Sequence, residues 1–187
     1  GVSEPVEGTC VTVTLEGRRP LVAEVQSLLT PSAGGSPRRT VSGVDAARVN
    51  MLLAVLQRRA RFALAQDDCY VATVGGVRLS EPASDLAVAV AVASAKLSAP
   101  VPQGMIAVGE LGLAGEVRPV PGIGRRVREA ARLGFTRALV PRSPEPLGDV
   151  PAGFTVAEVG SIGEALATIP TWTGGGPAAR PEVGPGR

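Results

Sequence analysis

The sequence predicts an α/β (α+β) domain in which strands and helices interleave around a mixed sheet. Short runs with a strand period recur along the chain, segments with a helical period separate them, and one long run is apolar throughout. With 187 residues, 44% of them hydrophobic, the chain is long enough to bury one sizeable core. Only 3% of the residues are aromatic, so we expect a core of Val, Leu, Ala and Ile.

The longest apolar run lies at residues 80–100, with the sequence SEPASDLAVAVAVASAKLSAP. Pro82 suits a first helical turn, and the acidic residues near the start and Lys96 near the end match a helix dipole. Because residues 86–95 are apolar on every side, we expect a buried helix, one too short to cross a bilayer. Its valines alternate with alanines, which is also a strand period, so a strand is the competing interpretation.

Before this run the pattern predicts a hairpin, a helix and a second hairpin. The first hairpin pairs strands at 10–16 and 21–29 and is followed by a loop at 31–39. A helix begins at Ser42 or Asp45 and carries helical periodicity as far as Phe62 and Ala63. The second hairpin joins a strand at 68–74 to one at 77–80 through the tight turn Gly75-Gly76.

After the run, shorter elements alternate to the end of the domain. The expected elements are strands at 105–110 and 116–120 around a turn at 112–115, a helix from 123 to 133 closed by Gly134, strands at 138–140 and 154–159, and a last helix opened by a capping box at Ser161 and ending at Ile169. We therefore expect a domain at 10–170, with a loose segment at 1–9 and a Gly/Pro-rich, disordered tail at 171–187.

Composition excludes several kinds of chemistry. Without histidine, the chain cannot form a Ser-His-Asp or Cys-His triad, or a zinc site with histidine ligands. Cys10 and Cys69 lack CxxC spacing and are expected to be apolar strand residues in a reduced, cytoplasmic compartment. No signal peptide is visible, and a chain that starts at Gly1 without Met is expected to be a piece of a longer one.

Several blocks together resemble a known family. GGVRLSEPASDLAVAVAVAS at 75–94, GELGLAGEVRPVPGIGRRVREAARLGF at 109–135 and RALVP at 137–141 occur in this order. With the upstream blocks at 11–29 and 49–60, they resemble the Lon-protease-like C-terminal domain of the RadA (Sms) family of bacterial DNA repair proteins. The resemblance covers roughly residues 9–170.

The resemblance implies the fold of Lon proteolytic domains, related to the second domain of ribosomal protein S5. In the family, a zinc ribbon and a RecA-like ATPase precede this domain, which serves a DNA-dependent branch-migration motor. This sequence has no GxxxxGK[ST] and no CxxC, so ATP, Mg and Zn are expected in domains absent here and no cofactor within it. The implied partners are DNA and other copies of the chain, in a homo-oligomeric ring expected to be a hexamer, and not a membrane.

Lon proteases use a serine nucleophile and a lysine base, and the resemblance implies that both are missing here. Ala83 stands at the serine position and Gly124 at the lysine position. Ser84 is a fallback nucleophile, but one helical step turns it away by about 100°. Lys96, the only lysine, lies about 18 Å farther along the same helix. A carboxylate base from a neighbouring subunit stays open as an alternative, although we expect Ser84 to be a small residue near a helix start.

Basic clusters are the candidates for contact with DNA. The candidate residues are Arg38, Arg39, Arg125, Arg126, Arg128 and Arg132, with a further group at Arg58, Arg59 and Arg61. Residues 125, 128 and 132 share a helical face, with Arg126 more to the side. The alternative is a solvated or salt-bridged surface, since the net charge is only +2 and an arginine bias also accompanies GC-rich genomes. Scattered aromatics argue against base stacking, so contact should be to the backbone and indifferent to sequence.

From these observations we expect a non-proteolytic scaffold domain that forms a ring and contacts DNA. Two alternatives remain. One is a working Lon-like serine endopeptidase, and the other is a subunit-packing module whose arginines are all structural.

Overall fold

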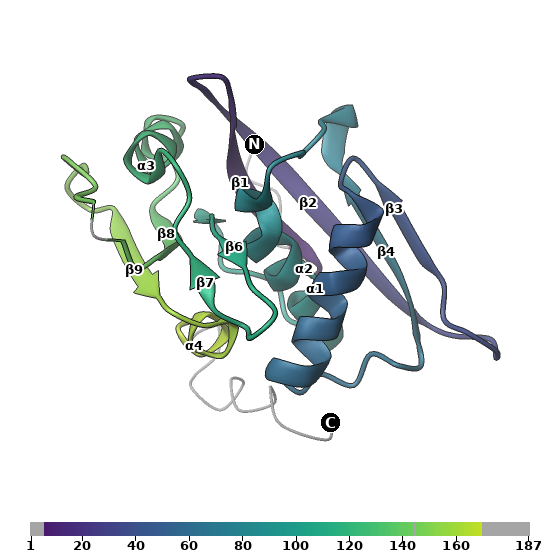
Figure 1. The fold of residues 1–187 in the computed structure, drawn as a ribbon. Helices are drawn as coiled ribbons and strands as arrows, with labels where there is room; N and C mark the ends of the chain where they lie inside the picture. Colours follow the sequence, from purple (N-terminus) through teal and green to yellow (C-terminus); the bar gives the residue numbers. More distant parts are fainter. Residues whose placement is uncertain (1–5, 144, 170–187) are drawn as a thin grey trace.

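The computed structural model describes residues 6–143 and 145–169 and shows a mixed α/β fold (Figure 1). A seven-stranded sheet runs in the order β3-β4-β2-β1-β5-β8-β9 and is mostly parallel. The predicted fold class is thereby confirmed. The strands are β1 (Thr9–Glu16), β2 (Arg19–Pro31), β3 (Arg39–Ser42), β4 (Asp67–Thr73), β5 (Met105–Ala107), β8 (Arg137–Pro141) and β9 (Thr155–Val159), with a separate two-stranded ladder of β6 (Glu110–Leu111) and β7 (Val117–Arg118). The helices are α1 (Ala46–Arg59), α2 (Asp85–Leu97), α3 (Ile123–Arg132) and α4 (Ile162–Ala167), with 3-10 turns η1 (Val74–Gly76) and η2 (Pro82–Ser84).

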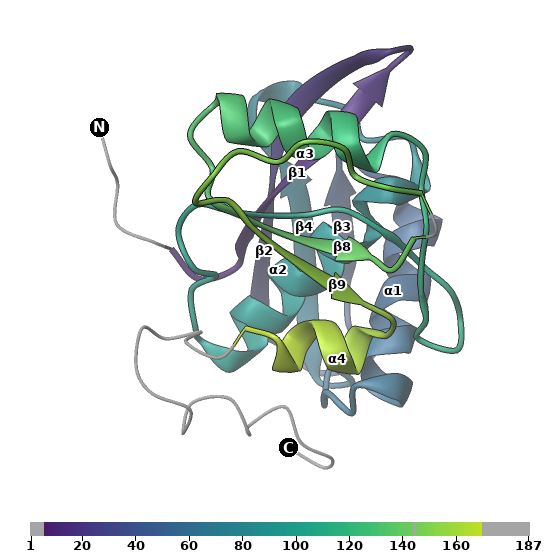
Figure 2. The same ribbon diagram turned by 90° about the vertical axis from the view of Figure 1, so that its left-hand side faces the viewer.

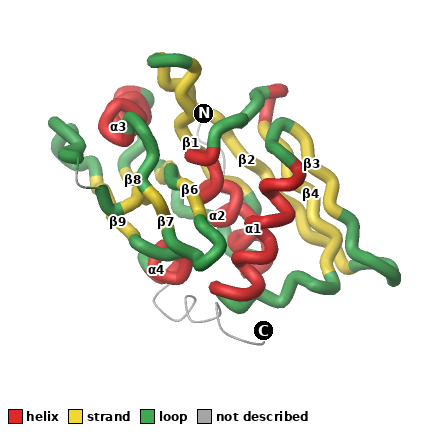
Figure 3. The backbone as a smooth tube through the Cα atoms, in the orientation of Figure 1, coloured by secondary structure: helices red, strands yellow, loops and turns green. Residues whose placement is uncertain are grey.

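Helices cover both faces of the sheet (Figures 2 and 3). Alternate residues of β1 show this, because Cys10 packs in the core beneath α1, α2 and α4, whereas Val13 packs in a second core beneath α3. The same alternation holds in β5, where Met105 and Ala107 face the first core and Ile106 the second. The central strands β5 and β8 are buried on both faces, which explains their continuous apolar runs.

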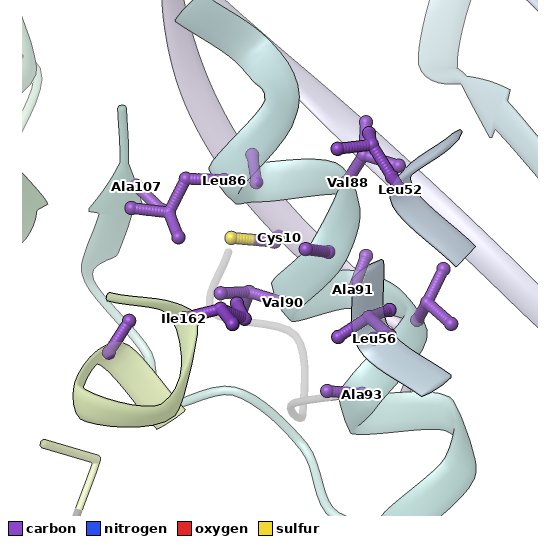
Figure 4. Packing of buried hydrophobic residues seen from close by; sticks show 14 of the residues in the cluster. Cys10, Leu52, Leu56, Leu86, Val88, Val90, Ala91, Ala93, Ala107 and Ile162 are labelled. Carbon is purple, nitrogen blue, oxygen red and sulfur yellow. The ribbon is translucent and has the colours of Figure 1, made fainter. Parts of the chain in front are cut away.

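The central apolar run forms α2, as predicted, and the strand alternative is wrong. Every residue from Asp85 to Ser94 is buried, so the helix lies inside the molecule rather than on it. Figure 4 shows Val88, Ala91 and Ala93 of this helix among side chains from α1, and Leu86 beside Ala107. Small alanines on a central helix let neighbouring elements approach closely, which suits a core with few aromatic residues.

The first hairpin is confirmed, and the second prediction of a hairpin is wrong. β1 pairs with β2 antiparallel over its whole length, from Thr9 opposite Gln26 to Glu16 opposite Arg19. Residues 77–80 do not pair with β4, because β2 and β3 already occupy both edges of that strand. Instead, η1 turns the chain away and Leu79 forms a single parallel bridge with Val44.

The ends of several other helices and strands differ from the predicted ones, because the chain turns there. Asp45 caps α1 by accepting a hydrogen bond from the Arg48 N–H, but the helix ends at Arg59 because Arg61 adopts a left-handed φ of 63°. Phe62 is still buried, although it lies outside the helix. The expected strand at 105–110 is split between β5 and β6, and α4 ends at Ala167.

Some expectations fall outside the described residues. The expected tail at 171–187 lies there, as does most of the segment at 1–9. Across residues 6–143 and 145–169, the helices are all too short or too polar for a bilayer span.

Candidate functional site

The start of α2, where the resemblance to Lon proteases predicts a nucleophile, is buried. Ala83 and Ser84 are 3% and 4% exposed. The Ser84 hydroxyl donates a hydrogen bond to the Glu81 carbonyl at 3.1 Å, and the Gly109 N–H donates to the Ala83 carbonyl at 2.9 Å. The serine is therefore held inside the turn that begins the helix rather than presented to a substrate.

The lysine lies far from this serine. Lys96 occupies the last turn of α2, and its Nζ atom is 2.8 Å from Oδ2 of Asp67. A general base must approach the hydroxyl to about 3 Å. Within the described residues, the ammonium is committed to a carboxylate at the opposite end of the helix from Ser84.

The position expected for the catalytic lysine has no room for a side chain. Gly124 lies in the first turn of α3, and a Cβ atom built there would lie 2.3 Å from the Leu147 carbonyl oxygen. It would also lie 2.9 Å from Nη1 of Arg128. The loop after β8 thus covers the position at which the resemblance to Lon proteases predicts a lysine.

Arg126 was predicted as a contact for DNA, and the structure removes it from that role. Its side chain is 0% exposed, and its guanidinium forms a salt bridge with Glu81 at 2.5 Å. The same group donates to the carbonyls of Pro121 at 3.0 Å and Val13 at 2.9 Å. A guanidinium enclosed by four acceptors cannot reach a phosphate, so Arg126 is a structural residue.

Glu81 is the partner that holds this arginine. Its carboxylate also accepts hydrogen bonds from the Thr14 hydroxyl and the Leu15 N–H, both at 3.1 Å. Burial alone would raise the pKa of the Glu81 carboxyl, but the hydrogen bonds from Arg126, Leu15 and Thr14 lower it below the ordinary 4.5. The Glu81 carboxylate is therefore ionised at neutral pH, and its pair with Arg126 ties α3 to β1 and to the turn before α2.

A second ion pair anchors the same end of α2. Asp85 is 1% exposed and accepts hydrogen bonds from Arg48 Nε at 2.6 Å and Nη2 at 2.5 Å. The Leu111 N–H donates to it at 3.0 Å. The hydrogen bond to Asp85 raises the pKa of Arg48. Such a bidentate fork fixes α1, α2 and β6 relative to one another.

The other candidate arginines of α3 lie nearer the surface than Arg126. Arg128 is exposed and donates to the Leu147 carbonyl at 2.9 Å. Arg132 is 68% exposed and forms a bidentate pair with Glu129 at 2.9 and 2.7 Å. Arg125 is partly exposed. Arg128 and Arg132 thus have different partners, one in the loop after β8 and the other on α3 itself.

Arg38 and Arg39 belong to a different part of the surface. They lie at β3, one of the two edge strands of the sheet, whereas α3 packs on β1 and β2 (Figure 1). The Arg38 N–H donates to Oδ1 of Asp68 at 2.7 Å, and Arg39 Nη1 donates to the Asp67 carbonyl at 2.6 Å. The two candidate clusters therefore do not form one continuous site on a single copy of the chain.

Comparison with known proteins finds chains that are similar over most of this sequence. DNA repair protein RadA of Mycobacterium tuberculosis is 54% identical over 162 residues, which are 87% of this chain and 33% of that protein. The chain is a relative of RadA. RadA of Mycolicibacterium smegmatis is 51% identical over 88% of the chain, and RadA of Streptococcus pyogenes is 45% identical over 87%. The chain spans about a third of the length of these RadA proteins.

A second comparison covers the middle of the chain. The family model of subunit ChlI of Mg-chelatase matches residues 55–144, from within α1 to just after β8. That match leaves out β1 and β2. Within the parts of the chain that the structure describes, no group of three or more cysteines and carboxylates is placed to hold a metal ion.

Two features of this RadA relative were missed from sequence. The pattern presents Glu81 as a helix-dipole charge, whereas the structure shows it as the partly exposed partner of the buried Arg126. Arg18 and Arg19, in the GRRP turn of the first hairpin, are exposed at the end of the sheet where α3 begins. They lie more than a hundred residues before α3 in the chain, so a single sequence does not indicate that the two segments are close in space.

Proposed function

We propose that the chain is a non-proteolytic, Lon-like scaffold domain of a RadA-type DNA repair protein. In this proposal it assembles with copies of itself into a ring and contacts the phosphate backbone of DNA without regard to base sequence. The full-length protein would be a DNA-dependent ATPase whose nucleotide site lies in another domain. The similarity to RadA over 87% of the chain supports the family context.

The observation that carries the non-proteolytic part is the contact at Gly124. With the Leu147 carbonyl oxygen 2.3 Å from the place of its Cβ, no lysine side chain fits there. Ser84 is 4% exposed and hydrogen-bonded within its own turn. An acyl-transfer site needs an accessible nucleophile within reach of a base, whereas among the described residues Ser84 is buried and Lys96 is paired with Asp67 at the other end of α2.

The peptidase alternative is tested by cleavage of casein and of fluorogenic peptides. We expect no signal above buffer for the wild-type chain or for Ser84→Ala. Cleavage that the wild-type chain shows and Ser84→Ala loses would overturn the proposal.

The DNA part is tested by retention on labelled duplexes across a salt series. Several arginines on a surface should give an affinity that falls steeply with salt, because each neutralised phosphate adds about 0.9 to the logarithmic slope. Arg125→Glu with Arg132→Glu should weaken retention. Arg142→Glu is the matched control for Arg132→Glu alone, since Arg142 is also exposed and paired with a glutamate, but at α4.

A pure packing module is the second candidate, and two contacts favour it. Arg128 and Arg132 already have partners within the chain, the Leu147 carbonyl and Glu129. Light scattering on the same variants separates the two. A changed particle size with unchanged affinity for DNA would favour packing, whereas the reverse supports the proposed contact.

A further inference from the structure

Glu129 lies on the surface of α3 among arginines. The Nε and Nη2 atoms of Arg132 donate to its two carboxylate oxygens at 2.9 and 2.7 Å. These hydrogen bonds lower the pKa of the Glu129 carboxyl, and the charge of Arg19 on β2 adds to the effect. Arg125, four residues earlier, shares the face of Glu129 on the helix.

The fork that Arg132 presents to this carboxylate is the geometry that also holds a phosphate. A carboxylate is planar and a phosphate is tetrahedral, but each presents two oxygens at a spacing that matches two parallel N–H donors. Arg132 is 68% exposed and Glu129 is 17% exposed, so the fork is accessible from solvent. An anion that reaches it must displace the glutamate.

The turn between β1 and β2 brings two more arginines to this end of the molecule. A Cβ built on Gly122, the residue before α3, would lie 2.9 Å from Leu15 Cδ1, so the helix starts against the end of β1. Arg18 and Arg19 follow directly in the turn and are exposed. Figures 1 and 2 both show the tip of this hairpin beside α3.

We propose that the β1–β2 turn and α3 form one nucleic-acid phosphate-binding strip, in which Glu129 is an internal competitor of the phosphate. The strip consists of Arg18, Arg19, Arg125 and Arg132. This inference rests on the proposed function, since it takes the DNA backbone as the ligand. It adds that the free protein holds its strip partly neutralised, so that binding exchanges an intramolecular carboxylate for an external phosphate.

The test is the affinity of the 187-residue chain for a fluorescein-labelled duplex and its single strand, measured by anisotropy across a salt series. Glu129→Gln should tighten binding by about threefold to tenfold at low salt and steepen the salt slope. Glu129→Ala serves as the second variant. Arg18→Glu with Arg19→Glu should weaken binding by more than about tenfold and abolish the gain from Glu129→Gln.

Glu164→Gln is the matched control. It makes the same change in net charge and frees another exposed arginine, Arg142, from a 2.7 Å pair, but at α4, far from α3 (Figure 2). We expect its affinity to equal that of the wild-type chain. Suppose that the wild-type chain binds DNA and that both Glu129 variants bind no more tightly than this control. The proposed role of Glu129 in the strip is then wrong, whereas the proposed function stands. If the wild-type chain does not bind even at low salt, the proposed function itself fails.

Discussion

The guanidinium of Arg126 lies fully buried against the carboxylate of Glu81, with Nη1 and Nη2 donating to Oε1 and Oε2 at 2.5 and 3.2 Å. Glu81 precedes η2 and α2, whereas Arg126 belongs to α3, so one ion pair joins helices on opposite faces of the sheet. Removal of either partner leaves a buried or partly buried charge without compensation.

Arg126→Ala should therefore lower the free energy of unfolding by about 3 to 5 kcal/mol. The adjacent Arg125→Ala is the control, because that side chain is partly exposed and should change stability by less than about 0.5 kcal/mol. Urea unfolding followed by circular dichroism measures both. Equal stability of the two variants would contradict a structural role for Arg126.

The same pair predicts a pH dependence. The pKa of Glu81 is lowered from 4.5 in the folded chain, so its stabilisation is present above the unfolded pKa and is lost as pH falls through the folded pKa. Glu81→Gln should be less stable than wild type at neutral pH, and the gap should close below about pH 4.5. Unfolding curves at a series of pH values would show it. Glu158→Gln, an exposed change on β9, is the control and should change stability at neutral pH by less than about 0.5 kcal/mol.

Two glycines test whether the lysine position is closed. Gly124 and Gly163 each follow the isoleucine that begins a helix, α3 and α4. Gly124→Ala should destabilise by about 1 to 3 kcal/mol, because its Cβ meets the Leu147 carbonyl.

Gly163→Ala is the matched control, since the nearest atom to its Cβ is Ser161 Oγ at 4.0 Å. It should be neutral or stabilising by up to about 1 kcal/mol. Thermal unfolding compares the pair. If the Gly124→Ala protein is as stable as Gly163→Ala, the loop after β8 moves aside at little cost and the lysine position is not closed.

The burial of α2 predicts a large cost for a cavity in it. Leu86 is 0% exposed and lies against Ala107 (Figure 4), so Leu86→Ala should cost about 2 to 5 kcal/mol. Leu113→Ala removes the same atoms from a side chain that is 66% exposed and should cost less than about 0.5 kcal/mol. Denaturant midpoints at constant m-value would establish the difference.

Local sequence predicted most elements because their signals are local. The hairpin of β1 and β2, the cap of α1 at Asp45, the buried α2 and the capping-box serine of α4 follow from period and capping residues within a few positions. The failed hairpin at 77–80 has the right turn residues. It is wrong because β2 and β3 already fill both edges of β4, a fact that no local window contains.

By itself the sequence determined the α/β class, the apolar central helix and the absence of histidine chemistry, since composition and periodicity act through neighbouring residues. Only the tertiary structure decided which arginine is buried and which is exposed. Arg125 and Arg126 are adjacent and chemically identical, but one helical step of about 100° takes one toward solvent and the other onto Glu81 and the Val13 carbonyl. A charged side chain's role depends on what the fold brings within a few ångströms of it, and those partners lie as many as 113 positions away in the chain.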